Sequence, residues 1–219
     1  MAGLFETLRV RKGQIPFLRE HVARFATSLA ALGMAPPVAG VEERLRRHGG
    51  HGDLVVRLTL DERGERIETR PLPAERPMRV VLSDVPHQPY PHKVTAREVF
   101  DSARERVVPN RADEVLLFTR EGLLAEGSIT SAFVWMDETL CTPPLELGIL
   151  PGVGRARLIA VARARGIGVR EERLSRGQVA GLPLLLVNAV RGVVEAGIQG
   201  APRPPADDRT LRLAGAFWG

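Results

Sequence analysis

The chain has 219 residues, 44% of them hydrophobic and 26% charged, which is enough apolar material for an ordinary packed core in one large domain or two small ones. Aromatic residues make up only 5%, so the core must rely on Leu, Val and Ala, which favours mixed α/β structure. Lysine and arginine exceed aspartate and glutamate by 31 to 26, but the two kinds are interleaved, as in "DERGERIETR", so we expect no nucleic-acid partner.

The single cysteine, Cys141, excludes an internal disulfide and a cysteine-based zinc site. It fits a reducing compartment, and we expect it in the core. The N-terminus has no basic-then-apolar leader, and no apolar run is long enough to span a bilayer. We therefore expect a cytoplasmic protein with no membrane association and no bound metal.

The first half of the chain predicts a lobe of strands and helices. Residues 3–18 predict a hairpin around the "RKGQ" turn, residues 17–33 a helix ending at Gly33, and residues 41–50 a second short helix. The following segments predict two strands around "ERGE" in 53–72, a strand in 78–85 and a helix in 95–107. The polar connector 106–112 follows, and we place the domain boundary there, with lobes at 1–105 and 113–219.

The second half predicts a lobe of similar character. Residues 114–144 predict three short strands, and 148–175 a glycine loop feeding a helix and then a strand. A short helix near 175–181, a buried strand turning into a hairpin partner in 182–200, and a closing helix capped by Asp207 or Asp208 complete the chain. The expected fold class is α+β, with each lobe built on a mainly antiparallel sheet with helices.

Lys93 is one of only two lysines in a chain with 29 arginines. A guanidinium stays protonated and cannot act as an amine nucleophile, whereas a desolvated lysine can lose its proton and form a Schiff base. Lys93 follows His92 in the stretch "PYPHKVTAR", which predicts a loop entering a helix. Lys12 is most simply a solvated turn residue. On this pattern alone, a chemical role and an ordinary surface charge both remain open for Lys93.

Three further features could act together with Lys93. Glu126 ends a predicted strand in "LLAEGSIT", and Arg24, on a predicted helix, can give an anion a planar bidentate partner. Residues 148–157, "GILPGVGRAR", join glycines to a helix start, where backbone N–H groups can bind phosphate. A lysine, a carboxylate near a ring nitrogen and a phosphate cradle are what a pyridoxal-phosphate site requires. Each feature alone is equally compatible with a surface residue or a plain helix start.

Five stretches in order resemble the motifs of the class IV pyridoxal-phosphate aminotransferase and aminodeoxychorismate lyase family. They are "LFETLRVRKGQIPFLREHVARFATSLAALG", "HKVTAR", "ADEVLLFTREGLLAEGSITSAFVW", "TPPLELGILPGVGRARLI" and "LLVNAVRG". The resemblance covers nearly the whole chain. It implies the family's fold, with a cofactor site between two lobes, a small-molecule substrate, and a homodimer with sites near its interface.

The resemblance also implies roles for individual residues. Lys93 would carry pyridoxal 5'-phosphate as a Schiff base, Glu126 would pair with the pyridine nitrogen, and Arg24 would bind the phosphate. The other implied cofactor contacts are Leu150 near the ring, the backbone N–H groups of Val153 and Gly154 at the phosphate, and Ala189 in "VNAVRG", also at the phosphate.

The sequence departs from the family pattern in three places. A further strand pair and a Gly-Asp-Gly stretch usually precede "FETLRV", so we expect one wall of the substrate pocket to be missing or altered. Gly154 stands where many members have a Thr whose hydroxyl holds the phosphate, which leaves that contact to the backbone. Ala96 and Glu98 stand where members often have Asn or Tyr, which affects the expected substrate class more than the cofactor.

The short N-terminus, "HKVTAR" and "VNAVRG" are most similar to the 4-amino-4-deoxychorismate lyase branch, which predicts loss of pyruvate to give 4-aminobenzoate. That substrate carries two carboxylates. Arg57 in "VVRLTL" and Arg191 in "NAVRGVV" are the candidates to bind them, because each interrupts an apolar strand, where an arginine needs an anion. For Arg57, an outward-facing position on a half-exposed strand is equally compatible.

Two other functions remain open on the sequence. An aminotransferase acting on branched-chain or D-amino acids would use the same Lys93, Glu126 and Arg24 and differ only in its pocket. A pseudoenzyme or anion-binding module that keeps the fold is the alternative from a different class.

Overall fold

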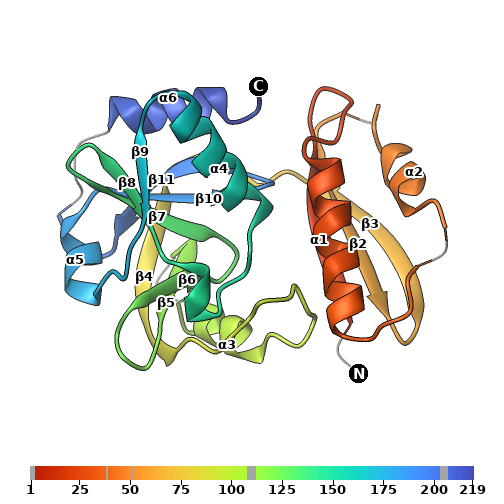
Figure 1. Ribbon diagram of the computed structural model, residues 1–219, viewed down its shortest axis with the longest axis horizontal. Helices are drawn as coiled ribbons and strands as arrows, with labels where there is room; N and C mark the ends of the chain where they lie inside the picture. Colours follow the sequence, from red (N-terminus) through yellow and green to blue (C-terminus); the bar gives the residue numbers. More distant parts are fainter. Residues whose placement is uncertain (1–2, 38, 51, 108–111, 203–206) are drawn as a thin grey trace. The chain divides into compact units, whose positions relative to one another are not determined.

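The computed structural model describes residues 3–37, 39–50, 52–107, 112–202 and 207–219. They form two compact units, each with its own sheet: Met1–Ala74 with His92–Ala96, and Glu75–Pro91 with Arg97–Gly219 (Figure 1). Within the described ranges, no helix is long and apolar enough to cross a membrane.

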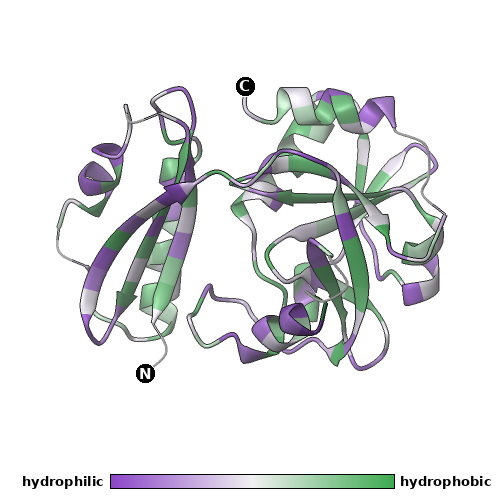
Figure 2. Cartoon of the chain, turned by 180° about the vertical axis from the view of Figure 1, so that it is seen from behind, coloured by the Kyte–Doolittle hydropathy of each residue, from purple (hydrophilic) through white to green (hydrophobic). Residues whose placement is uncertain are grey.

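The first unit contains a three-stranded antiparallel sheet in the order β1-β2-β3. Its elements are β1 (Leu4–Val10), α1 (Leu18–Ala31), α2 (Val41–Arg46), β2 (Leu54–Asp61) and β3 (Gly64–Pro71). Figure 2 shows α2 as mostly hydrophilic, and Leu45 is its buried residue.

Alternation along β1 divides the side chains of the first sheet between two faces. Because successive side chains of a strand point to opposite sides, the even-numbered residues of β1 share one face. Leu4 and Leu8 pack there with Phe25 and Leu29 of α1 in one apolar cluster. Glu6 lies on the same face as Leu4 and Leu8, so its carboxylate faces α1.

The second unit contains a mixed eight-stranded sheet in the order β6-β5-β4-β11-β10-β7-β8-β9. Its strands are β4 (Met78–Pro86), β5 (Glu114–Phe118), β6 (Leu124–Gly127), β7 (Ser131–Met136), β8 (Thr139–Thr142), β9 (Gly168–Glu171), β10 (Leu184–Asn188) and β11 (Gly192–Ile198). Its α-helices are α3 (Glu98–Val107), α4 (Val153–Ala164), α5 (Arg176–Gly181) and α6 (Asp208–Ala216).

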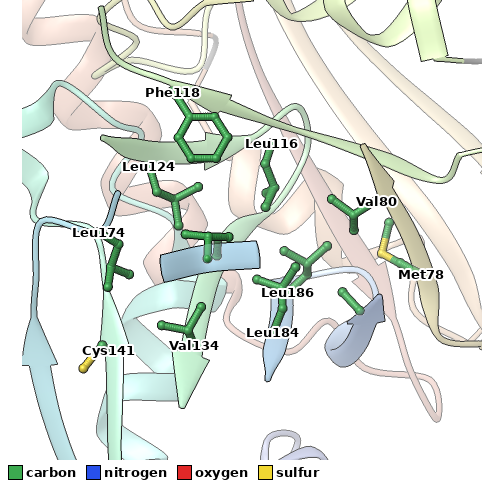
Figure 3. Packing of buried hydrophobic residues seen from close by; sticks show 13 residues of the cluster. Met78, Val80, Leu116, Phe118, Leu124, Val134, Cys141, Leu174, Leu184 and Leu186 are labelled. Carbon is green, nitrogen blue, oxygen red and sulfur yellow. The ribbon is translucent and has the colours of Figure 1, made fainter. Parts of the chain in front are cut away.

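The core of the second unit is an apolar cluster on one face of this sheet, formed by side chains from strands far apart in the sequence (Figure 3). Leu184 and Leu186 of β10 enter this cluster, whereas the alternate residues Leu185 and Val187 are buried on the other face, where α4 packs against β10. Cys141 is fully buried in the same cluster, as predicted. Strand β10 is therefore buried on both faces.

The α+β class and most elements are confirmed by the structure. The first hairpin is an exception: a single bridge joins Arg11 to Gln14, and residues after it enter α1, while the partner of β1 is β2. Asp207 is the cap of α6, because its side chain accepts a hydrogen bond from the Arg209 N–H.

The contacts group the chain differently from the predicted division at 106–112. Both β4 and α3 precede that division, yet they belong to the second unit, and α3 packs against β4 and β5. Residues 108–111 of the predicted linker lie outside the described residues.

Candidate active site

Lys93 lies in the first unit, on a loop segment beside β1. The Phe5 N–H donates to the Lys93 carbonyl at 2.9 Å, and Val94 forms an antiparallel bridge with Leu4. The Thr95 N–H donates to the Gly3 carbonyl at 2.7 Å. As the sequence predicted, Lys93 lies on a loop that enters a helix: the pairing with β1 at Val94 is an isolated bridge, and α3 begins at Glu98. Backbone pairing therefore fixes the position from which the Lys93 side chain extends.

Two cationic side chains, Lys93 and Arg57, lie over the ring of Phe5 in the first unit. The Lys93 Nζ lies 4.6 Å from the centroid of the Phe5 ring, and the Arg57 guanidinium carbon lies 4.0 Å from it. Because Phe5 and Arg57 are odd-numbered residues of adjacent strands, both point away from the α1 face. The predicted substrate-binding arginine and the predicted cofactor lysine are thus brought together by Phe5.

Arg24 is held on the α1 face of the same sheet by Glu6. Its Nε donates to Glu6 Oε1 at 2.8 Å and its Nη2 to Oε2 at 2.6 Å, a bidentate pair. His21 Nδ1 lies 2.8 Å from the same Oε2. Burial alone would raise the pKa of Glu6, but the charges of Arg24 and His21 and their hydrogen bonds lower it from 4.5 to about 2. Glu6 thus fixes the orientation of the arginine predicted to bind phosphate.

We expect Glu6 to make the first unit acid-sensitive. A depressed folded-state pKa contributes stability that is present above 4.5 and lost as the pH falls toward 2. Wild type should lose about 2 kcal/mol more between pH 7 and pH 3 than Glu6→Gln does. Urea unfolding followed by far-UV circular dichroism measures both. The exposed Glu20→Gln variant should keep the wild-type pH dependence, and an equal dependence in Glu6→Gln would contradict the assignment.

Glu126 is buried in β6 of the second unit, 5% exposed. Its Oε1 accepts a hydrogen bond from the Leu150 N–H at 3.1 Å and lies 3.1 Å from Nε2 of His87. Among the described residues, both contacts fall on Oε1, which leaves Oε2 able to receive a proton donor from a ligand. Leu150 and Glu126, predicted as neighbours of one ring, are therefore in direct contact.

The first turn of α4 lies against the loop that follows β10. A Cβ atom on Gly154 would stand 2.8 Å from two backbone carbons of Asn188 and 3.1 Å from the Ala189 N. A Cβ atom on Gly152 would stand 2.8 Å from Ser131 Oγ. Because the first N–H groups of a helix have no partner within it and lie at the positive end of its dipole, this is a place where an anion can bind. Glycine at 154 is required by the close approach of two backbones.

Adding a methyl group at Gly154 is therefore expected to disturb this turn. Gly154→Ala should lower the free energy of unfolding by about 1–3 kcal/mol, because the new Cβ would meet backbone atoms that must shift. Affinity for pyridoxal phosphate should fall with it. Gly215→Ala in α6 is the matched control, since nothing lies within 4 Å of that position. Equal stability and cofactor affinity in the two variants would contradict the close approach.

Asn188 ties the loop after β10 to the turn after Glu126. Its Oδ1 accepts hydrogen bonds from the Val190 N–H at 3.0 Å and the Arg191 N–H at 2.8 Å. Its Nδ2 donates to the Ile129 carbonyl at 3.1 Å. The predicted phosphate contact at Ala189 and the predicted ring partner Glu126 are thus connected through one amide side chain.

Arg191 lies in the turn between β10 and β11 and not within a strand as predicted, since β11 begins at Gly192. Burial lowers the pKa of its guanidinium, and its charged neighbours include Asp113, Arg104 and Glu114. These neighbours lie at the start of β5 and on α3. Its role in substrate binding stays a prediction.

Each unit supplies groups of the kinds that bind pyridoxal phosphate. The second unit offers a buried carboxylate with an available oxygen and, 24 residues later in sequence at Leu150, a backbone contact leading into the α4 N-terminus. The first unit offers the amine of Lys93 and the guanidinium of Arg24. Sequence reasoning missed His87, Ser131 and Asn188, because each contacts a residue that lies far from it in the sequence and no local pattern marks those contacts.

Comparison with known proteins identifies the family. The model of the family described as Amino-transferase class IV matches residues 3–196. A protein of Methanocaldococcus jannaschii, provisionally named a branched-chain-amino-acid aminotransferase, is 28% identical over 201 residues, covering 79% of this chain and 69% of that protein.

Solved structures show the same fold. One, provisionally named a 4-amino-4-deoxychorismate lyase, is 26% identical with a TM-score of 0.84, covering 100% of this chain and 90% of that one. A hypothetical aminotransferase from Mycobacterium tuberculosis, in its pyridoxal-phosphate-bound form, is 21% identical with a TM-score of 0.85, covering 99% and 88%.

The family match spans both units and all five motifs quoted above. Its members are pyridoxal-phosphate-dependent enzymes, which confirms the predicted cofactor and the predicted enzyme class. The chain belongs to the class IV aminotransferase family.

Proposed function

We propose that the protein is a 4-amino-4-deoxychorismate lyase that releases pyruvate and 4-aminobenzoate. The observation that carries the proposal is the arrangement in the second unit. There, Glu126 is joined to Leu150 and the uncapped first turn of α4 lies against Ala189. Similarity to a provisionally named lyase structure at 26% identity, together with "HKVTAR" and "VNAVRG", supports the lyase branch.

The proposed chemistry assigns a task to each group. Pyridoxal phosphate, when bound, supplies an electron sink for the bond changes in the substrate. Glu126 would pair with the protonated ring nitrogen, and the N–H groups of Val153 and Gly154 would bind the phosphate; the family resemblance gives Arg24 the role of a phosphate ligand as well. The Nζ of Lys93 removes a proton from the substrate as general base and returns one to the departing pyruvate as general acid.

Arg57 is proposed to bind a substrate carboxylate. It shares the Phe5 ring with Lys93, so an anion held by its guanidinium would lie on the same face of the sheet as the reacting amine. Arg191 is the second candidate for this role. We also propose a homodimer, on the family resemblance, and a cytoplasmic location, on the single cysteine, which fits a reducing compartment.

A mixing assay tests the reaction. Enzyme, pyridoxal phosphate and 4-amino-4-deoxychorismate should yield 4-aminobenzoate and pyruvate in equal amounts with no keto acid added. Fluorescence of 4-aminobenzoate and a lactate dehydrogenase coupling for pyruvate follow the two products separately. Product that forms only when 2-oxoglutarate or pyruvate is supplied would exclude the lyase.

An aminotransferase is the second candidate, favoured by the 28% identity to the Methanocaldococcus jannaschii protein. It would show amino transfer from a branched-chain or D-amino acid to 2-oxoglutarate. Protein that binds no pyridoxal phosphate would exclude both enzymes and leave the non-catalytic alternative.

A further inference from the structure

His87 lies where it can direct the carboxylate of Glu126. It follows β4 immediately, and its Nε2 lies 3.1 Å from Glu126 Oε1, with both side chains buried. Its backbone N–H donates to the Phe118 carbonyl at 2.7 Å. The edge of its ring meets the Phe100 ring at a centroid distance of 5.8 Å and an angle of 82°. The imidazole is therefore held at both its backbone and its ring.

The proton on this contact can be assigned from the chemistry of the acceptor. Glu126 Oε1 already accepts the Leu150 N–H at 3.1 Å. The proposed pairing of Glu126 with a protonated pyridine nitrogen requires an ionised carboxylate. Because an ionised carboxylate only accepts hydrogen bonds, His87 Nε2 must carry the hydrogen of this contact. Two donors then converge on one oxygen.

We propose that His87 is a positioning residue for the cofactor ring. By donating to Oε1, it turns Oε2 of Glu126 toward the pyridine nitrogen, where that oxygen pairs with the proton on the ring. The backbone donor at Leu150 and the imidazole donor at His87 share this task, because both are directed at Oε1. The inference rests on the proposed cofactor role of Glu126 and adds a residue that acts through it.

Three substitutions separate the hydrogen bond from simple packing. His87→Gln keeps an amide N–H at about the reach of Nε2, His87→Asn keeps the amide but is one methylene shorter, and His87→Leu fills space without a donor. His48→Gln removes an imidazole that lies elsewhere and is the matched control. If His87→Leu does not fold, the Gln and Asn pair still carries the comparison.

The readout is the pyridine nitrogen itself. Pyridoxal phosphate labelled with ¹⁵N in its ring is bound to each purified variant, and the nitrogen chemical shift reports whether the ring is protonated. Wild type, His87→Gln and His48→Gln should give the protonated shift. His87→Asn and His87→Leu should move toward the unprotonated shift, and their kcat should fall about 10- to 100-fold while KM stays within about twofold.

The outcomes distinguish a failure of the role of His87 from a failure of the proposed function. A protonated shift and wild-type kcat in both His87→Asn and His87→Leu would overturn the role of His87 and leave the proposed function intact. A wild-type enzyme that binds no labelled cofactor would overturn the proposed function and this inference with it. Equal losses in the Gln and Asn variants would assign the effect to the imidazole ring as packing and contradict the donor role.

Discussion

Lys93→Arg is expected to lose turnover by at least about a thousandfold and to lose the visible absorption of lysine-bound pyridoxal phosphate. The guanidinium keeps the positive charge beside Phe5, where Lys93 Nζ now lies 4.6 Å from the ring centroid. It cannot supply the amine that bonds to the cofactor and moves the proton. The substitution therefore preserves the electrostatics of the site and removes its chemistry.

The unfolding free energy of Lys93→Arg should stay within about 0.5 kcal/mol of wild type, because the segment is held by its backbone pairing to β1. Lys12→Arg is the matched control, since it changes the only other lysine, in an exposed turn. Lys12→Arg should behave as wild type in absorption and turnover. Retention of both properties in Lys93→Arg would exclude Lys93 as the cofactor lysine.

Glu114→Gln is expected to lower the free energy of unfolding of the second unit by about 3 kcal/mol or more. Glu114 is fully buried at the start of β5, and its Oε1 accepts hydrogen bonds from the Val115 N–H at 2.9 Å and from the N–H and hydroxyl of Ser128. Its Oε2 accepts from the Ile129 N–H at 3.2 Å and the Thr130 hydroxyl at 2.8 Å. In the Gln variant, an NH2 group replaces one of the two carboxylate oxygens. That NH2 group would face the N–H and hydroxyl groups that now donate to the oxygen, and it cannot accept their hydrogen bonds.

The loss should extend from stability to the site. The turn 127–130 joins β6, which carries Glu126, to β7, and its Ile129 carbonyl accepts the hydrogen bond from Asn188. Loosening the turn should therefore weaken pyridoxal phosphate binding as well. Urea unfolding followed by tryptophan fluorescence measures the stability of this unit, because Trp135 and Trp218 both lie in it. The exposed Glu105→Gln variant on α3 is the control, and a loss below about 1 kcal/mol in Glu114→Gln would contradict the account.

Local patterns in the sequence predicted the elements well and the connections between them less well. Helix α4 lies in the segment 148–175 where a helix was predicted, and its apolar residues Leu158, Val161 and Ala162 are buried. Such periodicity is a property of consecutive residues. The parallel pairing of β11 with β4 joins residues more than 100 positions apart, and no local pattern encodes which strand lies beside which.

The same reason explains which site residues were found. Lys93, Glu126 and the glycine loop stood in short motifs, so their types and spacing could be compared with a family. His87 and Glu114 act through buried partners 39 and 14 residues away, respectively, and become meaningful only when β4, β5 and β6 are folded together. The Lys93 segment was correctly predicted as a loop before a helix, but its bridge to β1 was not predicted, because Leu4 lies 90 residues before Val94 in the chain.

The central claim is that Lys93 is the residue that bonds to pyridoxal phosphate. With only two lysines in the chain, borohydride treatment of the cofactor-loaded protein followed by peptide mapping gives a direct answer, because reduction makes the lysine linkage permanent. The account predicts the cofactor mass on the peptide that contains Lys93 and none on the peptide that contains Lys12. A label on Lys12, or no label on either peptide, would contradict it.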